Sequence, residues 1–329
     1  MSFQPTTADD NTMTEQPFLS LVVVTYNRGD ALREALESLL AMPKYPDYDF
    51  EIVVIDNGST DHTPSVVQNA AINAPYKVRY FFEPKPGIAC ARNRGVRESE
   101  GDWIAFFDDD QLAPSDWLVH LVRACRSEDL RYAGGGYVLK YVQPNPPPLD
   151  VFSRQMLGEF VVSTPTHYHY HFLPATGNVV IDKSLFASLG EFDESMHQSG
   201  EDTEWFTRLV LAKIPGRHVP ESHILHVIPP HRTDSNYIEY VARRSGIILA
   251  YRDRKYRGIP MTRYLSLLRL LRSFTLCTLQ RTVAKLTRNQ AMEVGTTGKM
   301  KRDLAYIWTA WGNEASIQKL ASQNAHRGK

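Results

Sequence analysis

The sequence predicts an α/β fold in which a mainly parallel sheet is flanked by helices and followed by a helical C-terminal extension. Two observations support this prediction. In the first part of the chain, short apolar runs typical of buried strands alternate with stretches whose apolar residues recur at helical spacing. Strands that alternate with helices form right-handed βαβ units and therefore a parallel sheet. From residue 237 onward the strand pattern ends, and helices are predicted instead.

Four strands are predicted in the first part, and polar residues follow each of them. The strands cover residues 19–25, 51–55, 78–82 and 103–107, and the intervening helices cover residues 29–42, 61–71 and 88–97. In the first helix, Leu32, Leu36 and Leu39 show the spacing of a buried helix face. Open α/β sheets bind ligands at the carboxyl ends of their strands. The residues directly after these strands are therefore the first candidates for a site.

The pattern changes after the fourth strand. Strands are predicted at residues 132–142 and 217–227, helices at residues 184–189 and 201–212, and a stiff proline-rich break at residues 143–148. Residues 166–181 have mixed strand character and contain His167, His169 and His171, which would share one face of a strand. That face is either a metal or anion patch or the polar side of a sheet.

The composition is that of a soluble globular protein, with 43% apolar and 22% charged residues in 329. Cys90, Cys125 and Cys277 are far apart, which indicates neither a disulfide framework nor a zinc site and fits a reducing compartment. Residues 1–17 are polar and acidic and lack the basic and apolar regions of a signal peptide, so we expect a disordered tail. No apolar run is long enough for a transmembrane helix. A cytoplasmic protein is expected.

A net charge of zero conceals a strong asymmetry. Residues 237–329 contain 18 lysines and arginines but only 5 acidic residues, a balance of +13, which leaves −13 for the rest. The basic end therefore suggests an anionic partner. In residues 261–286, where leucines and arginines are interspersed, two interpretations stand. The segment either lies on an anionic membrane surface, at the inner face of the membrane, or forms a helical hairpin on the core. A nucleic acid is not expected, because no recognised motif is present, and a homo-oligomer stays open.

Three consecutive aspartates, Asp108, Asp109 and Asp110, directly follow the fourth predicted strand. Like charges this close repel unless a positive group joins them. Carboxylate oxygens suit Mg²⁺ and Mn²⁺, and a cation held by one or two carboxylates commonly takes its other ligands from substrate phosphates. The alternative is a solvated acidic turn before the helix that begins near Pro114.

Four sequence blocks, in this order, resemble the family 2 glycosyltransferases. They read SLVVVTYNRGDALREALESLL, EIVVIDNGSTDHT, KPGIACARNRGVRESEGDWIAFFDDDQLAP, and a last block from ATGNVVIDKSLFASLGEFDE to SGEDTEWFTRL. The resemblance covers roughly residues 18–245 and implies a GT-A fold, which is Rossmann-like. It also implies a catalytic domain at residues 18–236, with a nucleotide-binding half at 18–130 and an acceptor half at 131–236. The basic helical region at 237–329 lies mostly outside it.

The resemblance implies an inverting transfer of a sugar from a nucleoside diphosphate sugar, UDP- or dTDP-linked, to a hydroxyl acceptor. The acceptor would be a glycan, a lipid-linked or another hydroxyl compound in polysaccharide or glycoconjugate synthesis. The nucleotide-binding residues it implies are Thr25, Tyr26, Asn27, Arg28, Asp56, Arg92, Asp108 and Asp109. A Tyr26 ring can stack on a base. Asp56 can accept the imide N–H of uracil or thymine, or it can simply form a turn. Arg92 either approaches the donor or lies on the surface.

The same resemblance implies Mn²⁺ or Mg²⁺ bound by Asp110, with Asp108 at the ribose or at the metal and His226 completing the ligands. The family's DxD site corresponds to Asp108 and Asp110. Many members have a non-acidic residue between these two positions, where this chain has Asp109. Which two of the three aspartates bind the cation therefore stays open. Arg232 is a further candidate for phosphate binding.

Glu201 and Asp202 occupy the place of the family's catalytic acid pair, with Asp202 as the base that takes the acceptor's proton. Burial beside Glu201 and the aspartates would raise the pKa of this base. The alternative is that both acids only complement the helix dipole. Gly177 and Asn178 resemble the sugar or acceptor loop, and Trp205 is either an acceptor platform or a core residue.

Two other functions compete with sugar transfer. A non-catalytic module that binds nucleotide sugars or glycans would not require the full acid set, yet Asp56, Asp108, Asp110 and Asp202 are all present. A nucleotidyltransferase would need a glycine-rich basic loop after the first strand, where this chain reads TYNRGD. Sugar transfer therefore accounts best for the sequence.

Overall fold

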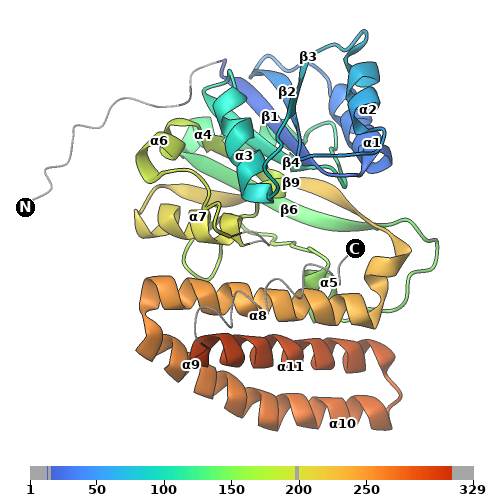
Figure 1. Cartoon of the computed structure of the whole chain (residues 1–329), viewed down its shortest axis with the longest axis vertical. Helices are drawn as coiled ribbons and strands as arrows, with labels where there is room; N and C mark the ends of the chain where they lie inside the picture. The colour runs from blue at the N-terminus through green and yellow to red at the C-terminus, as the bar shows by residue number, and fades with distance from the viewer. Residues whose placement is uncertain (1–12, 14–15, 197–199, 313–329) are drawn as a thin grey trace, which may run out of the picture.

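The structure is a computed structural model that describes residues 13, 16–196 and 200–312. Within these residues a nine-stranded sheet has the order β3-β2-β1-β4-β8-β6-β9-β5, with β7 paired to β9. Figure 1 shows this sheet among helices, with a separate stack of helices below it. The strands are β1 (Phe18–Thr25), β2 (Asp49–Asp56), β3 (Lys77–Phe82), β4 (Trp103–Asp108), β5 (Gln111–Leu112), β6 (Tyr132–Tyr141), β7 (Thr166–His167), β8 (Val179–Asp182) and β9 (Gly216–Ile228).

The predicted α/β fold with a mainly parallel sheet is confirmed. β1 runs parallel to β2 and β4, and β2 runs parallel to β3. β8 is antiparallel to both β4 and β6, whereas β6 and β9 are parallel, so only β5, β7 and β8 oppose the common direction. Parallel neighbours need crossover connections. The helices α1 (Gly29–Leu40), α2 (Thr63–Ala71) and α3 (Ile88–Glu98) provide them.

Helices cover both faces of the sheet, because alternate side chains of a strand face opposite layers. Leu19, Leu21 and Val23 of β1 join one core with α1, α2 and α4 (Trp117–Glu128). Val22 joins a second core with α3, α6 (Ser184–Leu189) and α7 (Glu201–Leu211). Strands buried on both faces are nearly continuous apolar runs, which explains why β1 and β4 are readily recognised from the sequence.

The helical C-terminal extension is also confirmed within the described residues. α8 (Ser235–Arg257) is followed by one long run made of α9 (Ile259–Arg272), the π-helical turn η3 (Ser273–Cys277) and α10 (Thr278–Leu286). α11 (Gln290–Trp311) packs between α8 and this run (Figure 1). The predicted boundary between residues 236 and 237 falls inside α8. No helix in the described part of the chain is both long and apolar enough to cross a bilayer.

Several local elements differ from the predictions. β5 and the short helix α5 (Val151–Met156) were not expected, and residues 166–181 form only β7, the turn η1 (Thr176–Asn178) and the start of β8. The predicted common strand face of His167, His169 and His171 is wrong. The chain reverses there, and His169 and Phe172 exchange backbone hydrogen bonds of 2.9 and 2.8 Å. The expected tail at residues 1–17 lies almost entirely outside the described residues.

Candidate functional site

The carboxyl ends of three neighbouring parallel strands meet at one edge of the sheet. The register pairs Val24 of β1 with Asp108 of β4, and Thr25 of β1 with Asp56 of β2. β1 is followed by α1 on one face of the sheet, whereas α3 leads into β4 from the other face. A change of side of this kind opens a crevice at the strand ends, where α/β sheets bind ligands.

Asp109 is the innermost of the three aspartates. It is only 4% exposed, accepts a hydrogen bond from the Thr25 hydroxyl at 2.8 Å, and pairs with Arg28 at 2.9 Å. Burial raises the pKa of Asp109. The charge of Arg28 acts against this increase, and the charge of Asp110 adds to it. Asp109 therefore ties the end of β1 to the turn after β4, and its predicted contact with a nucleotide stays a prediction.

Asp110 lies among positive groups. One of its carboxylate oxygens accepts hydrogen bonds from Arg232 at 2.8 Å and Arg28 at 3.2 Å, and the other lies 3.5 Å from Nε2 of His226. Burial would raise the pKa of Asp110, but His226, then Arg232 and Arg28, outweigh it and hold this pKa well below its usual range. His226 reaches Asp110 because β5 pairs with β9, with Gln111 opposite His226.

Asp108 points toward α3 and the loop before β8. Gln111 accepts from the Asp108 backbone N–H at 3.0 Å and donates to its carboxylate at 3.2 Å, while Arg92 lies 3.5 Å from the other oxygen. The Asp108 side chain is 40% exposed, the largest exposed fraction in the cluster. A Cβ on Gly177 would lie 2.6 Å from its Oδ2 atom. Glycine at this position thus lets the loop approach the carboxylate.

A single side chain joins Asp108 to the acid pair at the start of α7. Arg92, which is 5% exposed, forms an ion pair with Glu201 and also reaches Asp108. Glu201 is 1% exposed, and its Oε2 atom has no hydrogen-bond partner among the described residues. Burial raises the pKa of Glu201 to about 7, against the effect of Arg92 and with a further contribution from Asp202. The raised pKa predicted for Asp202 stays a prediction there; the raised pKa that the structure shows belongs to Glu201.

Asp202 is the more exposed member of the pair. It is half-buried, and its Oδ1 atom accepts from the backbone N–H of Thr203 at 2.6 Å. Its negative charge raises the pKa of both Glu201 and Asp108, because it lies close to both. Asp202 therefore combines partial exposure with proximity to the aspartate cluster.

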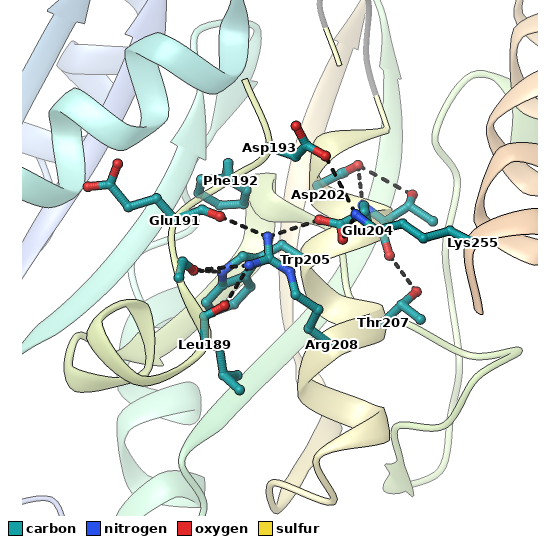
Figure 2. A network of polar contacts seen from close by, with 12 residues as sticks. Leu189, Glu191, Phe192, Asp193, Asp202, Glu204, Trp205, Thr207, Arg208 and Lys255 are labelled. Carbon is teal, nitrogen blue, oxygen red and sulfur yellow. Dashed lines mark hydrogen bonds and ion pairs between the residues drawn. The ribbon is translucent and has the colours of Figure 1, made fainter. Parts of the chain in front are cut away.

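The helix that carries the acid pair is anchored from two sides (Figure 2). Arg208 donates to the carbonyl oxygens of Leu189 at 2.7 Å and Glu191 at 2.8 Å, and to Glu204 at 2.9 Å. Glu204 is 1% exposed and also accepts from Lys255 of α8 at 2.7 Å. α8 thus helps to position α7, although it lies beyond the sheet.

The loops after β1 and β2 hold each other in place. Asn27 adopts a left-handed backbone with φ of 51°, and its N–H donates to the Ser59 hydroxyl at 2.8 Å. Asp56 is fully buried and accepts from the Ser59 N–H and the Tyr80 hydroxyl, both at 2.8 Å. This is the turn-forming role that the sequence offers as the alternative to base recognition. The ring of Tyr26, by contrast, is 47% exposed beside these loops.

Two residues predicted to contact sugar or acceptor lie inside the protein instead. Asn178 is fully buried, accepts from the Trp117 indole N–H at 2.7 Å, and donates to a backbone carbonyl of β6 at 2.8 Å. Trp205 is also fully buried and stacks on Phe186 with ring centroids 4.3 Å apart. For Trp205 the core alternative is therefore correct, whereas the contact predicted for Asn178 stays a prediction. Asn178 supports the loop of Gly177 from beneath, and Trp205 belongs to the core.

Three contributors to the site were not among the predicted residues. Gln111 fixes Asp108, Tyr80 holds Asp56, and Lys255 anchors α7. For Gln111 a signal existed, because it directly follows the aspartate run. Tyr80 and Lys255 act from another strand and another helix, so no local pattern marks them.

Asp110 and His226 fit a divalent cation by their chemistry. A carboxylate oxygen and an imidazole nitrogen are both ligands for such ions, and here they lie 3.5 Å apart. The described residues contain no group of three His, Cys, Asp or Glu side chains gathered as metal ligands. The predicted third ligand, Asp108, instead faces Arg92 and Gln111. A cation at Asp110 and His226 would therefore depend on substrate oxygens for its remaining ligands.

Comparison with known sequences gives a consistent family match. Residues 20–185 match the profile described as Glycosyl transferase family 2. The succinoglycan biosynthesis protein ExoM of Rhizobium meliloti (strain 1021) is 28% identical over 232 residues, which cover 69% of this chain and 72% of that protein. The glycosyltransferase AglE of Haloferax volcanii is 24% identical over 196 residues, which cover 58% of this chain and 61% of that protein.

Solved structures share the same fold. The mannosyltransferase PcManGT from Pyrobaculum calidifontis, in complex with GDP-Man and Mn²⁺, has a TM-score of 0.61 at 18% identity and covers 92% of this chain and 89% of its own. The S. aureus protein TarS 1–349 in complex with UDP has a TM-score of 0.51 at 16% identity and covers 90% and 92%. At these identities the likeness shows a GT-A-like fold.

Proposed function

The chain belongs to glycosyl transferase family 2, and from this premise we propose that it is an inverting, metal-dependent glycosyltransferase. It transfers a sugar from a nucleoside diphosphate sugar, UDP- or dTDP-linked, to a hydroxyl group of a glycan, a lipid-linked or another acceptor in polysaccharide or glycoconjugate synthesis. The main support is Arg92, which joins Asp108 at the end of β4 to Glu201 at the start of α7. The Arg92 side chain thus links an acid proposed to bind the donor with the acid pair proposed to act on the acceptor.

The donor binds at the ends of β1, β2 and β4 in this proposal. The exposed ring of Tyr26 stacks on the base. Arg28 and Arg232, which both pair with Asp110, bind phosphate oxygens, which their planar guanidinium groups match in geometry. Mn²⁺ or Mg²⁺, held by Asp110 and His226, would offset the charge of the diphosphate leaving group.

The acceptor is activated by Asp202. As the acceptor oxygen bonds to the anomeric carbon, the bond from that carbon to the diphosphate oxygen breaks, and Asp202 takes the hydroxyl proton. One in-line displacement of this kind inverts the anomeric configuration. Partial exposure of Asp202 and its closeness to Asp108 support this role. Glu201, paired with Arg92, keeps the start of α7 in position.

We also propose a cytoplasmic location, where nucleotide sugars would be available to the enzyme. All three cysteines are buried free thiols. Free thiols persist in a reducing compartment. The basic C-terminal helices lie outside the sequence match to the family and call for an explanation of their own.

A panel of UDP-, dTDP- and GDP-sugars with Mn²⁺ or Mg²⁺, scored by release of the nucleoside diphosphate, tests the proposal. Asp202→Asn should keep nucleotide binding but slow transfer by roughly 10²- to 10⁴-fold, the usual contribution of a general base. Asp110→Ala should lose the metal-dependent part of nucleotide binding. Transfer by Asp202→Asn at the wild-type rate would show that the base is another group. Donor binding without turnover in every combination, with acceptors present, would favour a non-catalytic binding module.

A further inference from the structure

The run formed by α9, η3 and α10 has its large apolar side chains on the outside. The buried residues in this run are all small, namely Thr262, Ser266, Ser273, Cys277 and Ala284. The exposed fractions of the large apolar residues range from 40% at Val283 to 80% at Leu286. These residues are Ile259, Met261, Tyr264, Leu267, Leu268, Leu270, Leu271, Phe274, Leu276, Leu279, Val283 and Leu286. A helix on the surface of a water-soluble domain normally shows the opposite arrangement.

The contact between this run and α11 is largely polar. Asp303 of α11 is fully buried and accepts from the Ser273 hydroxyl at 2.6 Å, from Arg272 at 2.6 Å and from Arg269 at 3.3 Å. Small and polar residues between helices, with large apolar residues facing outward, are typical of helices packed in lipid. Leu265 packs against the cluster of Ala250, Tyr306 and Ala310, whereas the exposed leucines of the run do little to hold the helices together and remain on the outer face.

The charge of this region selects an anionic surface. Residues 254–292 contain nine lysines and arginines and no acidic residue. Acids outside this segment pair with five of them, namely Lys255, Arg257, Arg269, Arg272 and Lys285. Arg263, Lys285 and Arg288 are exposed among the leucines. Trp308 and Trp311 of α11 are also exposed, at 42% and 52%. Trp side chains favour the boundary between water and lipid, because one end of the ring is apolar and the other polar.

We propose that the outer face of α9, η3 and α10 binds the surface of a bilayer that contains anionic phospholipids. The apolar side chains enter the acyl-chain boundary, and the lysines and arginines contact the headgroup phosphates. The run lies in the plane of the membrane, since no described helix is suited to cross it. Figure 1 shows α8 and α11 between α10 and the sheet. A bilayer on the outer side of α10 therefore leaves the strand-end site in water.

A second copy of this chain is the competing occupant. An apolar face of this size also suits a homodimer, but two copies that met through it would bring the exposed basic residues Arg263, Lys285 and Arg288 of each copy together. Of these three, only Lys285 has an acid nearby, Glu293 at 4.0 Å. Like charges in contact oppose association. Anionic headgroups satisfy both the apolar and the basic side chains, and for this reason the bilayer is the better match.

Co-sedimentation of the full chain with phospholipid vesicles, without any nucleotide sugar, tests the proposal. We expect binding to vesicles of equal parts phosphatidylcholine and phosphatidylglycerol, weaker binding as salt rises, and little binding to phosphatidylcholine alone. The triple variant Leu271→Glu, Phe274→Glu, Leu279→Glu should bind at least about tenfold more weakly, because three apolar side chains no longer enter the lipid. Arg263→Glu, Lys285→Glu, Arg288→Glu should lose the preference for the anionic vesicles.

A matched control uses exposed apolar residues on the catalytic domain. Ile72→Glu, Val161→Glu, Leu211→Glu changes side chains that are 66%, 69% and 51% exposed, and should bind vesicles like the wild type. Equal vesicle binding by the wild type and the Leu271, Phe274, Leu279 variant would overturn the proposal, as would the absence of binding by the wild type. A dimer seen by light scattering that this variant dissociates, without vesicle binding, would assign the face to self-association instead. Because no sugar is transferred in the assay, failure here leaves the proposed enzymatic function untouched.

Discussion

The ion pair of Arg92 and Glu201 allows a quantitative test of how the site is held together. Glu201 is 1% exposed and one of its oxygens has no hydrogen-bond partner among the described residues, so Arg92 is its main compensation. Arg92→Met places an uncharged, apolar side chain of similar length at residue 92 and so removes the positive charge. An isolated buried carboxylate becomes protonated, because its ionised form is poorly solvated. We therefore expect Glu201 to be neutral in this variant at neutral pH.

The size of the effect follows from proton linkage. An unfolded glutamate titrates near about pH 4.3, whereas burial raises the pKa of Glu201 to about 7 even beside Arg92. Between these values the folded chain binds a proton that the unfolded chain does not, so stability falls by about 1.4 kcal/mol per pH unit as pH rises. In the wild type this decrease ends near the folded pKa of about 7. In Arg92→Met it continues, to roughly 4 kcal/mol between about pH 5 and about pH 8.

The control is the double variant Arg92→Met, Glu201→Gln, which lacks the same positive charge but has no titrating group at residue 201. Asp108, the other partner of Arg92, is present in both variants, so its contribution cancels. Urea unfolding followed by tryptophan fluorescence at several pH values gives the difference in free energy of unfolding between them. We expect this difference to grow with pH at the slope of one proton. Parallel pH profiles would refute the burial of an ionisable Glu201 against Arg92.

Three further predictions concern other parts of the site. Gly177→Ala brings a methyl group against the side-chain amide of Gln111 and to 2.6 Å from Asp108 Oδ2. Both side chains must shift, so kcat/KM for transfer should fall at least about tenfold with little change in Tm. Unchanged kcat/KM would contradict the close approach. Thr25→Val removes the hydroxyl that donates to Asp109 at 2.8 Å, so the free energy of unfolding in urea should fall by about 1–3 kcal/mol. The loss should be larger above the pKa of Asp109 than below it, because the hydroxyl favours the ionised carboxylate. Lys255→Met removes the ammonium group of α8 that contacts buried Glu204, so the free energy of unfolding should again fall by about 1–3 kcal/mol. As a control, Lys213→Met changes an exposed lysine just after α7 and should leave the free energy of unfolding unchanged.

Local sequence signals were sufficient for the framework of the site. The apolar run of β4 ends where burial decreases, at Asp108, so the acids emerge from the sheet at the place that the sequence predicts. The turn residues after β1 and β2 likewise follow their strands directly, and the register brings Thr25 beside Asp56. Helix spacing predicted α6 and α7 to within one residue. These features depend on neighbours in the chain, and that is why a single sequence reveals them.

Contacts between distant segments are what the sequence does not show. Asn178 is a polar residue in a loop, and nothing nearby in the sequence shows that Trp117, 61 residues earlier, binds its side chain inside the protein. His226 meets Asp110 through β5, a strand of two residues that is too short to show any periodicity. The leucine spacing of α9 and α10 predicts helices but not which face packs, because the polar partner Asp303 lies on another helix.

The positions of the three aspartates bear on which of them can reach a ligand. Asp109 points inward to Thr25 and Arg28 and is 4% exposed, so the middle acid has a structural role inside the protein. Asp108 and Asp110 flank it on opposite sides, one beside Arg92 and the other beside Arg232. The unusual middle acid thus need not alter cation binding at Asp110 and His226, because its carboxylate is already held by Thr25 and Arg28. If Asp109 acts in this way, Asp109→Asn should leave the metal dependence of nucleotide binding intact, whereas Asp110→Asn should abolish it.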